Sequence, residues 1–145
     1  MKIFICEICG HIAFNNIPDK CPVCGAEKDK FKQNDTVFKE SREKSPEAEV
    51  KHIPEIIINK MCAVIPGGDC VDVIATIGKV IHPMEEKHYI RFIDGYQDDK
   101  FIGRFELTPL NLYPSTCFHL KKGIGKITIV ENCNIHGYWK SDVTI

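Results

Sequence analysis

The sequence predicts a mainly β protein in which a small domain built on metal knuckles precedes a larger antiparallel β-sandwich. Three observations predict this fold class. Two Cys-x-x-Cys-Gly motifs lie within residues 1–25, a charged stretch follows them, and the remaining chain alternates apolar and polar residues in short runs. We therefore divide the chain into a metal-binding domain at 1–35, a charged linker at 36–50 and a sandwich domain at 51–145.

The composition narrows the class of protein. The chain has 145 residues and a formal net charge of -1, so it has no basic stripe for nucleic acid or a membrane surface. Its apolar runs are too short to cross a bilayer, and the cysteine motif that begins at Cys6 leaves no room for a signal peptide. Cysteines without such a signal favour reduced thiols and metal ligation over disulfides. We expect a cytoplasmic protein.

The first domain contains two metal knuckles. Cys6 and Cys9 form one, Cys21 and Cys24 form the other, and a glycine after each permits the positive φ of a tight turn. Four thiolates suit zinc or a single iron, and spacing alone does not separate the two metals. A segment this short buries too little apolar surface to fold alone, so the metal should stabilise it. We interpret His11 as a surface residue, because four cysteines complete the site.

The residues around these knuckles resemble a known domain. Cys9-Gly-His-Ile-Ala-Phe14, the motif Cys-Pro-Val-Cys-Gly-Ala at 21–26 and Lys30-Phe31 are similar to the short rubredoxin-like domain of rubrerythrins. The resemblance covers nearly all of residues 1–35. It implies that the four cysteines bind one iron that passes single electrons, and it favours iron over zinc.

The linker and the second domain differ in pattern. Residues 36–50 mix Lys, Glu, Ser and Pro, which predicts a solvated connector that can include one helical turn. Runs with the period of a β-strand follow at 55–60, 71–77, 88–94, 116–120 and 126–130. Turns are expected at 66–69 and 94–99. Short antiparallel strands over residues 51–145 fit a β-sandwich of the immunoglobulin type.

A second metal site is indicated by four histidines and one cysteine. These are His52, His82, His88, Cys133 and His136. Soft sulfur and nitrogen donors select transition metals, and these ligands exceed the four of an ordinary zinc site. A blue-copper site is the alternative, but no methionine follows His136 as its axial ligand. Iron with four imidazoles in a plane and the thiolate on the axis fits better, and it leaves the position opposite sulfur open.

The three segments that carry these ligands resemble the superoxide reductase family of neelaredoxins and desulfoferrodoxins. They are Lys51-His52-Ile-Pro54, His82-Pro-Met-Glu-Glu-Lys-His88 and Cys133-Asn-Ile-His136-Gly-Tyr-Trp139. The resemblance covers residues 51–145 and implies an immunoglobulin-like sandwich that holds ferrous iron through the five ligands. It also implies one-electron reduction of superoxide to hydrogen peroxide, without the dismutation that releases oxygen.

The resemblance also implies roles for residues beside the ligands. Lys51 matches the family's catalytic lysine, whose charge would attract the superoxide anion and could order a water that delivers protons. Cys133 would donate electron density along the axis. The backbone N–H groups of Ile135 and His136 are candidates to hydrogen-bond its sulfur.

The sequence departs from the family in two places. A glutamate commonly precedes the lysine and binds resting ferric iron, but this chain has Val50 there. Glu49 is displaced by one residue and, on a strand, would point the other way, so we expect solvent or nothing as sixth ligand. The second departure is the rubredoxin-like domain, since desulfoferrodoxins carry a different module with adjacent cysteines.

The partners and the alternative functions follow from these resemblances. Electrons are expected from a rubredoxin or a pyridine-nucleotide-dependent reductase, relayed through the rubredoxin-like centre, and the family implies a homodimer or homotetramer. Two other functions remain open. One is a two-centre iron electron-transfer protein without superoxide reactivity, and the other is a zinc-ribbon binding module attached to a metal-storage sandwich.

Several residues near these motifs receive structural interpretations. We interpret Cys62, Cys70 and Cys117 as small buried hydrophobic residues and assign no metal role to His119. Tyr89 and Trp139 neighbour ligands and are expected to pack around the site.

Overall fold

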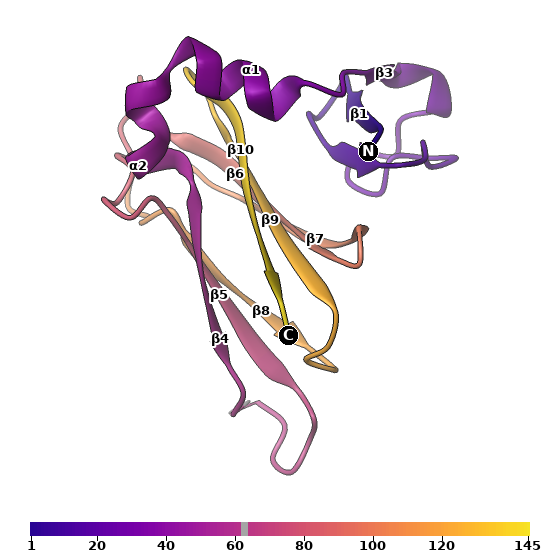
Figure 1. The fold of residues 1–145 in the computed structure, drawn as a ribbon, viewed down its shortest axis with the longest axis vertical. Coiled ribbons are helices and arrows are strands. Elements are labelled where there is room, and N and C mark those ends of the chain that lie inside the picture. Colours follow the sequence, from indigo (N-terminus) through magenta and orange to yellow (C-terminus); the bar gives the residue numbers. More distant parts are fainter. Residues whose placement is uncertain (62–63) are drawn as a thin grey trace.

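The computed structural model describes residues 1–61 and 64–145 of the chain. A small N-terminal module and a larger β-sandwich are joined by short helices (Figure 1). The module contains a three-stranded antiparallel sheet with the order β2-β1-β3. Its elements are β1 (Ile3–Cys6), β2 (Ile12–Phe14), the 3-10 helix η1 (Lys28–Lys30) and β3 (Phe31–Gln33).

The linker is helical over most of its length, which corrects the prediction of a solvated connector that can include one helical turn. It contains α1 (Val37–Lys44), the 3-10 helix η2 (Pro46–Ala48) and α2 (Glu49–His52). The Oγ1 of Thr36 donates to Glu40 across the first turn of α1 at 2.7 Å. Val37 and Ser41 are buried, and the Oγ of Ser41 accepts a hydrogen bond from the N–H of Tyr138 at 3.1 Å. Tertiary contacts on one face therefore stabilise a helix that is too short and too polar to form alone.

The second domain is a β-sandwich of two antiparallel sheets, which confirms the predicted fold class. One sheet has the order β10-β9-β6-β7 and the other β4-β5-β8. The first sheet consists of β6 (Ile90–Gln97), β7 (Lys100–Glu106), β9 (Lys126–Cys133) and β10 (Gly137–Thr144). The second sheet consists of β4 (Pro54–Asn59), β5 (Val71–Ile77) and β8 (Ser115–Leu120). The Oγ of Ser141 donates to the carbonyl of Pro54 at 2.6 Å, which ties β10 to β4.

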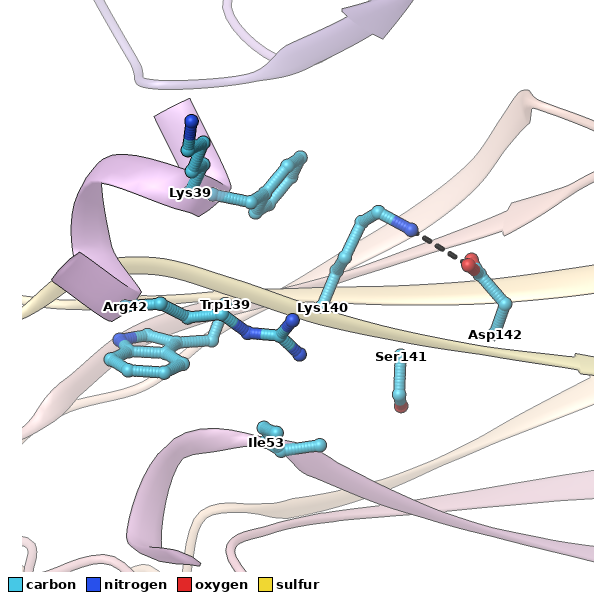
Figure 2. A pocket seen from close by; sticks show the side chains of 8 residues that line it. Lys39, Arg42, Ile53, Trp139, Lys140, Ser141 and Asp142 are labelled. Carbon is cyan, nitrogen blue, oxygen red and sulfur yellow. Dashed lines mark hydrogen bonds and ion pairs between the residues drawn. The ribbon is translucent and has the colours of Figure 1, made fainter. Parts of the chain in front are cut away.

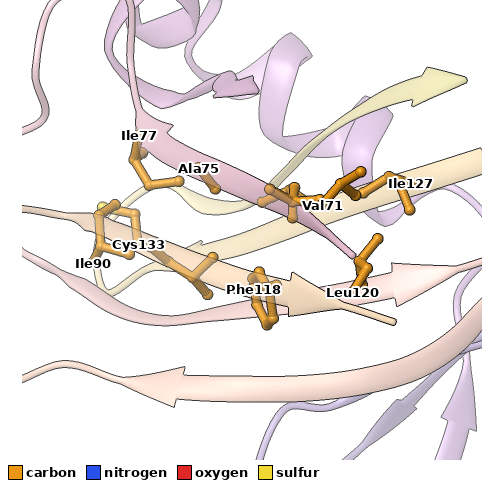
Figure 3. Packing of buried hydrophobic residues seen from close by; sticks show 11 residues of the cluster. Val71, Ala75, Ile77, Ile90, Phe118, Leu120, Ile127 and Cys133 are labelled. Carbon is orange, nitrogen blue, oxygen red and sulfur yellow. The ribbon is translucent and has the colours of Figure 1, made fainter. Parts of the chain in front are cut away.

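The core of the sandwich lies between the two sheets (Figure 3). On β5 every second residue is buried and the residues between them are partly exposed, as the period-two pattern predicts. The core cluster consists of Val71, Val73, Ala75, Ile77, Ile90, Ile93, Phe118, Leu120, Ile127, Ile129 and Cys133. Cys133, the last residue of β9, is thus part of the core. The core therefore holds this predicted metal ligand in place at one end of the sandwich.

Strand boundaries differ from the sequence prediction around one hairpin. The predicted turn at 94–99 is wrong over most of its length, because β6 continues to Gln97. The turn consists of Asp98 and Asp99, with φ values of 49° and 63°, as a two-residue hairpin of type I′ requires. The other predicted turn is confirmed, since the N–H of Gly68 donates to the carbonyl of Ile65 at 3.2 Å.

The N-terminal module packs on the face of the four-stranded sheet opposite to the core. Ile3, Ile12 and Phe14 form one buried cluster with Tyr96 and Val130 of the sandwich. The hydroxyl of Tyr96 donates to the carbonyl of Ile12 at 2.7 Å. These contacts bury both surfaces and join the two parts of the chain into one packed unit.

A buried ion pair lies within this interface. The guanidinium of Arg104 donates to both carboxylate oxygens of Asp94 at 2.6 and 2.8 Å, and its third contact is the carbonyl of Cys9 at 2.8 Å. Arg104 also stacks on the ring of Phe92, with its Cζ 3.5 Å from the centroid. The side chains of Arg104 and Asp94 are 5% and 0% exposed. The pair therefore links the first metal knuckle to the sandwich.

The prediction that His11 is a surface residue is wrong. His11 is 2% exposed, and its ring lies 4.7 Å from the ring of Phe101. Its Nδ1 is 3.4 Å from Asp94. The residue is buried because the module docks on the sheet, which the sequence of the module alone does not reveal.

Candidate metal centres

The four cysteines of the N-terminal module converge on one point. Their sulfur atoms lie within 4.8 Å of one another. The Sγ of Cys6 is 3.7 Å from that of Cys24, and the Sγ of Cys9 is 3.5 Å from that of Cys21. A tetrahedral ion with metal–sulfur bonds of about 2.3 Å places its ligands about 3.75 Å apart. The sulfur positions therefore fit one tetrahedral metal ion.

The knuckle geometry agrees with the expectation from the two glycines. Gly10 and Gly25 have φ values of 78° and 75°, and each N–H donates to the carbonyl of the first cysteine in its knuckle at 2.8 and 2.9 Å. Backbone N–H groups also reach the sulfurs: that of Ala26 lowers the pKa of the Cys24 thiol. Burial raises the pKa of Cys9 and Cys21, so a cation is needed to hold these two as thiolates.

The five ligands predicted for the second site also come together. His52, His82, His88, Cys133 and His136 each present a ligand atom within 4.8 Å of the others. They come from the end of α2, the β5–β6 connection, the end of β9 and the turn before β10. No carboxylate belongs to this group among the described residues.

The four imidazoles form a ring around a central point. Neighbouring ring centroids are 4.5 Å apart for His52 and His82, 4.6 Å for His82 and His88, 5.0 Å for His88 and His136, and 4.8 Å for His136 and His52. The diagonal from His52 to His88 is 6.2 Å. These four nearly equal edges and the longer diagonal describe a four-sided ring of imidazoles, which we call the square.

The positions of three ring nitrogen atoms indicate what the space inside this square can hold. The Nε2 atoms of His52 and His82 face each other at 3.0 Å, the separation of two cis ligands with metal–nitrogen bonds of about 2.1 Å. The Nε2 of His88 is buried and has no hydrogen-bond partner among the described residues. A buried polar atom without a partner is costly, so these nitrogens fit a metal ion better than a metal-free pocket.

The opposite nitrogen of each buried histidine is held by the backbone. The Nδ1 of His52 contacts the carbonyl of Ala48 at 2.8 Å, and the Nδ1 of His82 contacts the carbonyl of Pro83 at 2.6 Å. A carbonyl accepts only, so each Nδ1 carries the proton and each Nε2 keeps its lone pair for a metal. Burial lowers the pKa of His52 to about 4 and of His82 to about 3. Both rings are therefore neutral, as ligands must be.

The helical segment that carries His52 is fixed by a glycine in the loop after β5. Gly78 has a φ of 90°, and a Cβ there would lie 2.6 Å from the carbonyl oxygen of Lys51. The N–H of Gly78 donates to the carbonyl of Ile53 at 3.2 Å. A side chain at this position would push α2 away, so the glycine allows the backbone approach that brings His52 to the site.

Asn134 joins two ligand segments, a role that the sequence analysis missed. Its amide Nδ2 donates to the carbonyl of Lys87 at 3.0 Å, and its Oδ1 accepts from the N–H of Tyr89 at 2.9 Å. These bonds clamp the turn between Cys133 and His136 onto the loop that carries His88. The only signal in the sequence was its place inside the Cys-x-x-His motif.

The surroundings of Cys133 confirm one expectation and add a residue. The backbone N–H groups of His136 and Ile135 hydrogen-bond its sulfur, as predicted, although burial still raises the pKa of the thiol. Glu131 lies two residues earlier on the same core-facing side of β9. It is 0% exposed, and neither carboxyl oxygen has a partner among the described residues. Burial raises the pKa of Glu131 far above its usual range, so its carboxyl is neutral.

The residues beside the ligands differ partly from the expectations. Trp139 packs on His52 with ring centroids 5.1 Å apart, and its Nε1 donates to the carbonyl of His136 at 3.1 Å, which confirms its packing role. The strand assumed for Glu49 is wrong, because Glu49 and Val50 lie in α2. The carboxylate of Glu49 pairs with Arg42 at 3.2 Å on the surface.

A pocket lies between α1 and β10, beside the metal site (Figure 2). Trp139 lines it together with Ile53, and the cations Lys39, Arg42 and Lys140 surround it. Lys140 pairs with Asp142 at 2.7 Å. None of the metal ligands lines this pocket, so it is separate from the place where a substrate would meet the metal.

The remaining cysteines follow the interpretation only in part. Cys62 lies outside the described residues. Cys70 is 7% exposed and disulfide-bonded, which departs from the expectation of a reduced thiol. Cys117 is a partly buried free thiol that lies beside His119 and Asp72 on the outer face of the sheet.

Comparison with known proteins agrees with this geometry. The desulfoferrodoxin family model matches residues 43–142, and the rubredoxin-like domain of rubrerythrin matches residues 4–32. The desulfoferrodoxin of Desulfarculus baarsii is 35% identical over 98% of this chain and 96% of its own length. The superoxide reductase of Pyrococcus abyssi is 34% identical over 66% of this chain and 87% of its own length. Both family matches indicate iron as the metal of the sites described above.

Solved structures show the same fold. A superoxide reductase (neelaredoxin) variant from Ignicoccus hospitalis has a TM-score of 0.56 at 25% identity, covering 70% of this chain and 85% of that one. The superoxide reductase from Nanoarchaeum equitans has a TM-score of 0.55 at 29% identity, covering 66% of this chain and 93% of that one. Within the described residues, no helix is long and apolar enough to cross a membrane. The chain belongs to the desulfoferrodoxin family, and a rubrerythrin-type rubredoxin-like domain forms its N-terminus.

Proposed function

We propose that this protein is a superoxide reductase. The observation that carries the proposal is the square of four imidazoles with the Cys133 thiolate beside it, which supplies five donors and leaves a sixth position for a small ligand. Ferrous iron in this site would supply the electron that converts superoxide, with two protons, into hydrogen peroxide. Relatives that carry the name superoxide reductase support this choice.

The exposure of the ligands supports an open position on one side only. His52, His82 and Cys133 are each 1% exposed, whereas His88 and His136 are partly exposed. A substrate therefore approaches from the solvent side, while the thiolate stays in the apolar core. Burial protects the sulfur, and its backbone hydrogen bonds stabilise the thiolate form.

Lys51 is the residue that we propose to guide superoxide to the site. It lies on α2 next to His52 and is exposed. Burial lowers the pKa of His52 and His88, and the positive charge of Lys51 adds to this effect. An exposed ammonium in this place attracts a small anion and can order the water that delivers protons. Val50 offers no carboxylate, so we propose that solvent occupies the sixth position at rest.

Rapid mixing of the reduced full chain with superoxide tests the activity. We expect a thiolate-to-iron absorption band to appear as superoxide is consumed, with hydrogen peroxide formed and no oxygen released. Lys51→Ala should slow the second-order rate and flatten its dependence on ionic strength, with the iron content unchanged. Full reduction without any reaction with superoxide would instead support the two-centre electron-transfer protein.

We also propose that electrons reach this site through the rubredoxin-like centre. The hydroxyl of Tyr138 donates to the carbonyl of Gly10 at 2.8 Å, and Gly10 directly follows the ligand Cys9. Tyr138 is also two residues from the ligand His136. Burial raises the pKa of Tyr138 to about 12, so the hydroxyl keeps the proton that makes this bond. One hydrogen bond, the side chain of Tyr138 and three peptide bonds thus connect Cys9 with His136.

Tyr138→Phe tests the relay because it removes only the hydroxyl. We expect slower electron transfer from the four-cysteine centre to the second site, while superoxide still oxidises the second site at the unchanged rate. Equal transfer rates in the variant and the parent would remove Tyr138 from the path. The external donor (a rubredoxin or a pyridine-nucleotide-dependent reductase), the cytoplasmic location and the homodimer or homotetramer remain predictions.

A further inference from the structure

The outer face of the three-stranded sheet carries another group of metal-ligating side chains. Asp72 on β5 and Cys117 and His119 on β8 each present a ligand atom within 4.8 Å of the others. In the part of the chain that the structure describes, three such groups occur, and the other two are the metal centres above. This third group uses none of their residues.

The strand register explains why these side chains share one face. Asp72 pairs directly with His119 across the β5–β8 ladder, and Cys117 lies two residues before His119 on β8. Thr116, Phe118 and Leu120 on β8 point into the sandwich and are buried. Because side chains alternate along a strand, Cys117 and His119 point outward together with Asp72. The backbone ladder therefore places the three donors before any ion arrives.

The charges in this group favour a cation. The Nδ1 of His119 lies 2.7 Å from the Oδ1 of Asp72, with side chains 50% and 13% exposed. Cys117 is a free thiol, and both burial and the nearby Asp72 raise its pKa. A carboxylate and a thiolate side by side repel each other, so the thiol stays protonated without a metal. A divalent cation between them would neutralise both charges and hold the sulfur as thiolate.

We propose that Asp72, Cys117 and His119 form a third metal site, which binds a borderline-soft divalent cation such as Zn²⁺ with solvent as the fourth ligand. Zinc takes sulfur, nitrogen and oxygen donors in tetrahedral geometry. Bonds of about 2.0 Å to nitrogen and oxygen place those two atoms about 3.3 Å apart. The contact between His119 and Asp72 would therefore open slightly by side-chain rotation as the ion enters.

The position of the site suggests what the ion does. β8 is an edge strand of its sheet, paired on one side with β5. An ion held by side chains of both strands would tie this edge strand to the middle of the sheet. This role is independent of superoxide reduction.

Cobalt is a suitable spectroscopic probe for the site. Co²⁺ is added without oxygen to the full chain whose two iron sites are already loaded, and iron content is checked afterwards. We expect a thiolate-to-cobalt band in the parent and in Ser115→Ala, a control on the same face of β8, but none in Cys117→Ser. Asp72→Asn should weaken binding by at least the about 10- to 100-fold that loss of an outer partner of a ligand costs, because a neutral amide then replaces a carboxylate ligand. A band that persists in Cys117→Ser, or no band in the parent, overturns the proposal.

A second measurement does not depend on cobalt. Zn²⁺ should protect Cys117 from alkylation in the iron-loaded chain, measured on the peptide that contains it. The protection should disappear in His119→Gln, which keeps the cysteine and the sheet. Equal protection in this variant and in the parent would show that the ion binds elsewhere, and the pair of His119 and Asp72 would then be a surface ion pair only.

Discussion

The two metal centres of this protein are built in opposite ways. The four-cysteine centre takes its ligands from residues 6–24, and two of them, Cys6 and Cys21, also belong to the buried cluster of the module. The second centre takes its ligands from residues 52–136 and lies at the end of a sandwich whose core cluster has eleven buried residues in the part of the chain that the structure describes. The first site therefore depends on its metal for its fold, whereas the second depends on the fold for its geometry.

Removal of both metals should give the largest difference in stability between the N-terminal module and the sandwich. We expect the knuckle loops at 6–11 and 21–26 to lose amide protection, because structural metal ions contribute about 10 kcal/mol or more to such small modules. The sandwich strands should keep their protection, because an apolar core stabilises them. Hydrogen exchange on the chelated full chain measures this difference. Protected knuckles after chelation would show that docking on the sandwich suffices to fold the module.

Breaking the buried pair between the two parts should have the next largest effect. Arg104→Ala leaves the carboxylate of Asp94 buried without its cation, which costs about 3–5 kcal/mol of unfolding free energy. It also removes the bond to the carbonyl of Cys9. Arg42→Ala is the matched control, since its exposed pair with Glu49 contributes about 1 kcal/mol at most. Denaturant unfolding compares both variants, and equal losses would contradict the importance of the interface.

Loss of the hydrogen bonds that Asn134 makes between two ligand segments should affect only the second metal centre. Asn134→Ala removes both side-chain bonds to the His88 loop. We expect the affinity of the second site for iron to fall about 10- to 100-fold, as when residues that orient ligands are removed. The four-cysteine centre should keep its metal and its absorption spectrum. A simultaneous loss at both centres would mean that the substitution unfolds the chain.

Substitutions at two glycines should have the smallest effects on stability. They also form the most closely matched pair of variants. Gly25→Ala places a side chain at a φ of 75° with nothing within 4 Å, so it should cost about 1–2 kcal/mol of backbone strain. Gly10→Ala adds a clash, because its Cβ would lie 2.8 Å from the hydroxyl of Tyr138. Gly10→Ala should therefore lower the melting temperature more. Equal shifts would indicate that the module moves away from Tyr138 without cost.

Features that depend on residues close together in the chain could be predicted from the sequence. The knuckle spacing predicted the first centre, and the period-two runs predicted most strands of the sandwich. Features that depend on a distant contact could not be predicted. His11 was interpreted as exposed, but it is buried against Phe101 after docking, and α1 forms because β10 covers Val37 and Ser41.

The second metal centre has some features that could be predicted from the sequence and others that could not. Its five ligands could be chosen from sequence, because imidazole and thiolate are distinct metal donors and their motifs resemble a known family. Their square arrangement could not, since it requires α2, the β5–β6 connection and the end of β9 to meet. Gly78 and Asn134, which bring these segments together, carry no metal-binding chemistry of their own.

By itself, the sequence determined the ligand types, the two-part division and the strand-rich character of the second part. These follow from residue chemistry and from local periodicity, which act over a few residues. Only the tertiary structure decided how the module docks through Arg104 and Tyr138, and that Asp72 meets Cys117 and His119 across two strands. Such contacts join residues far apart in the chain, and their geometry exists only once apolar burial has brought the strands together.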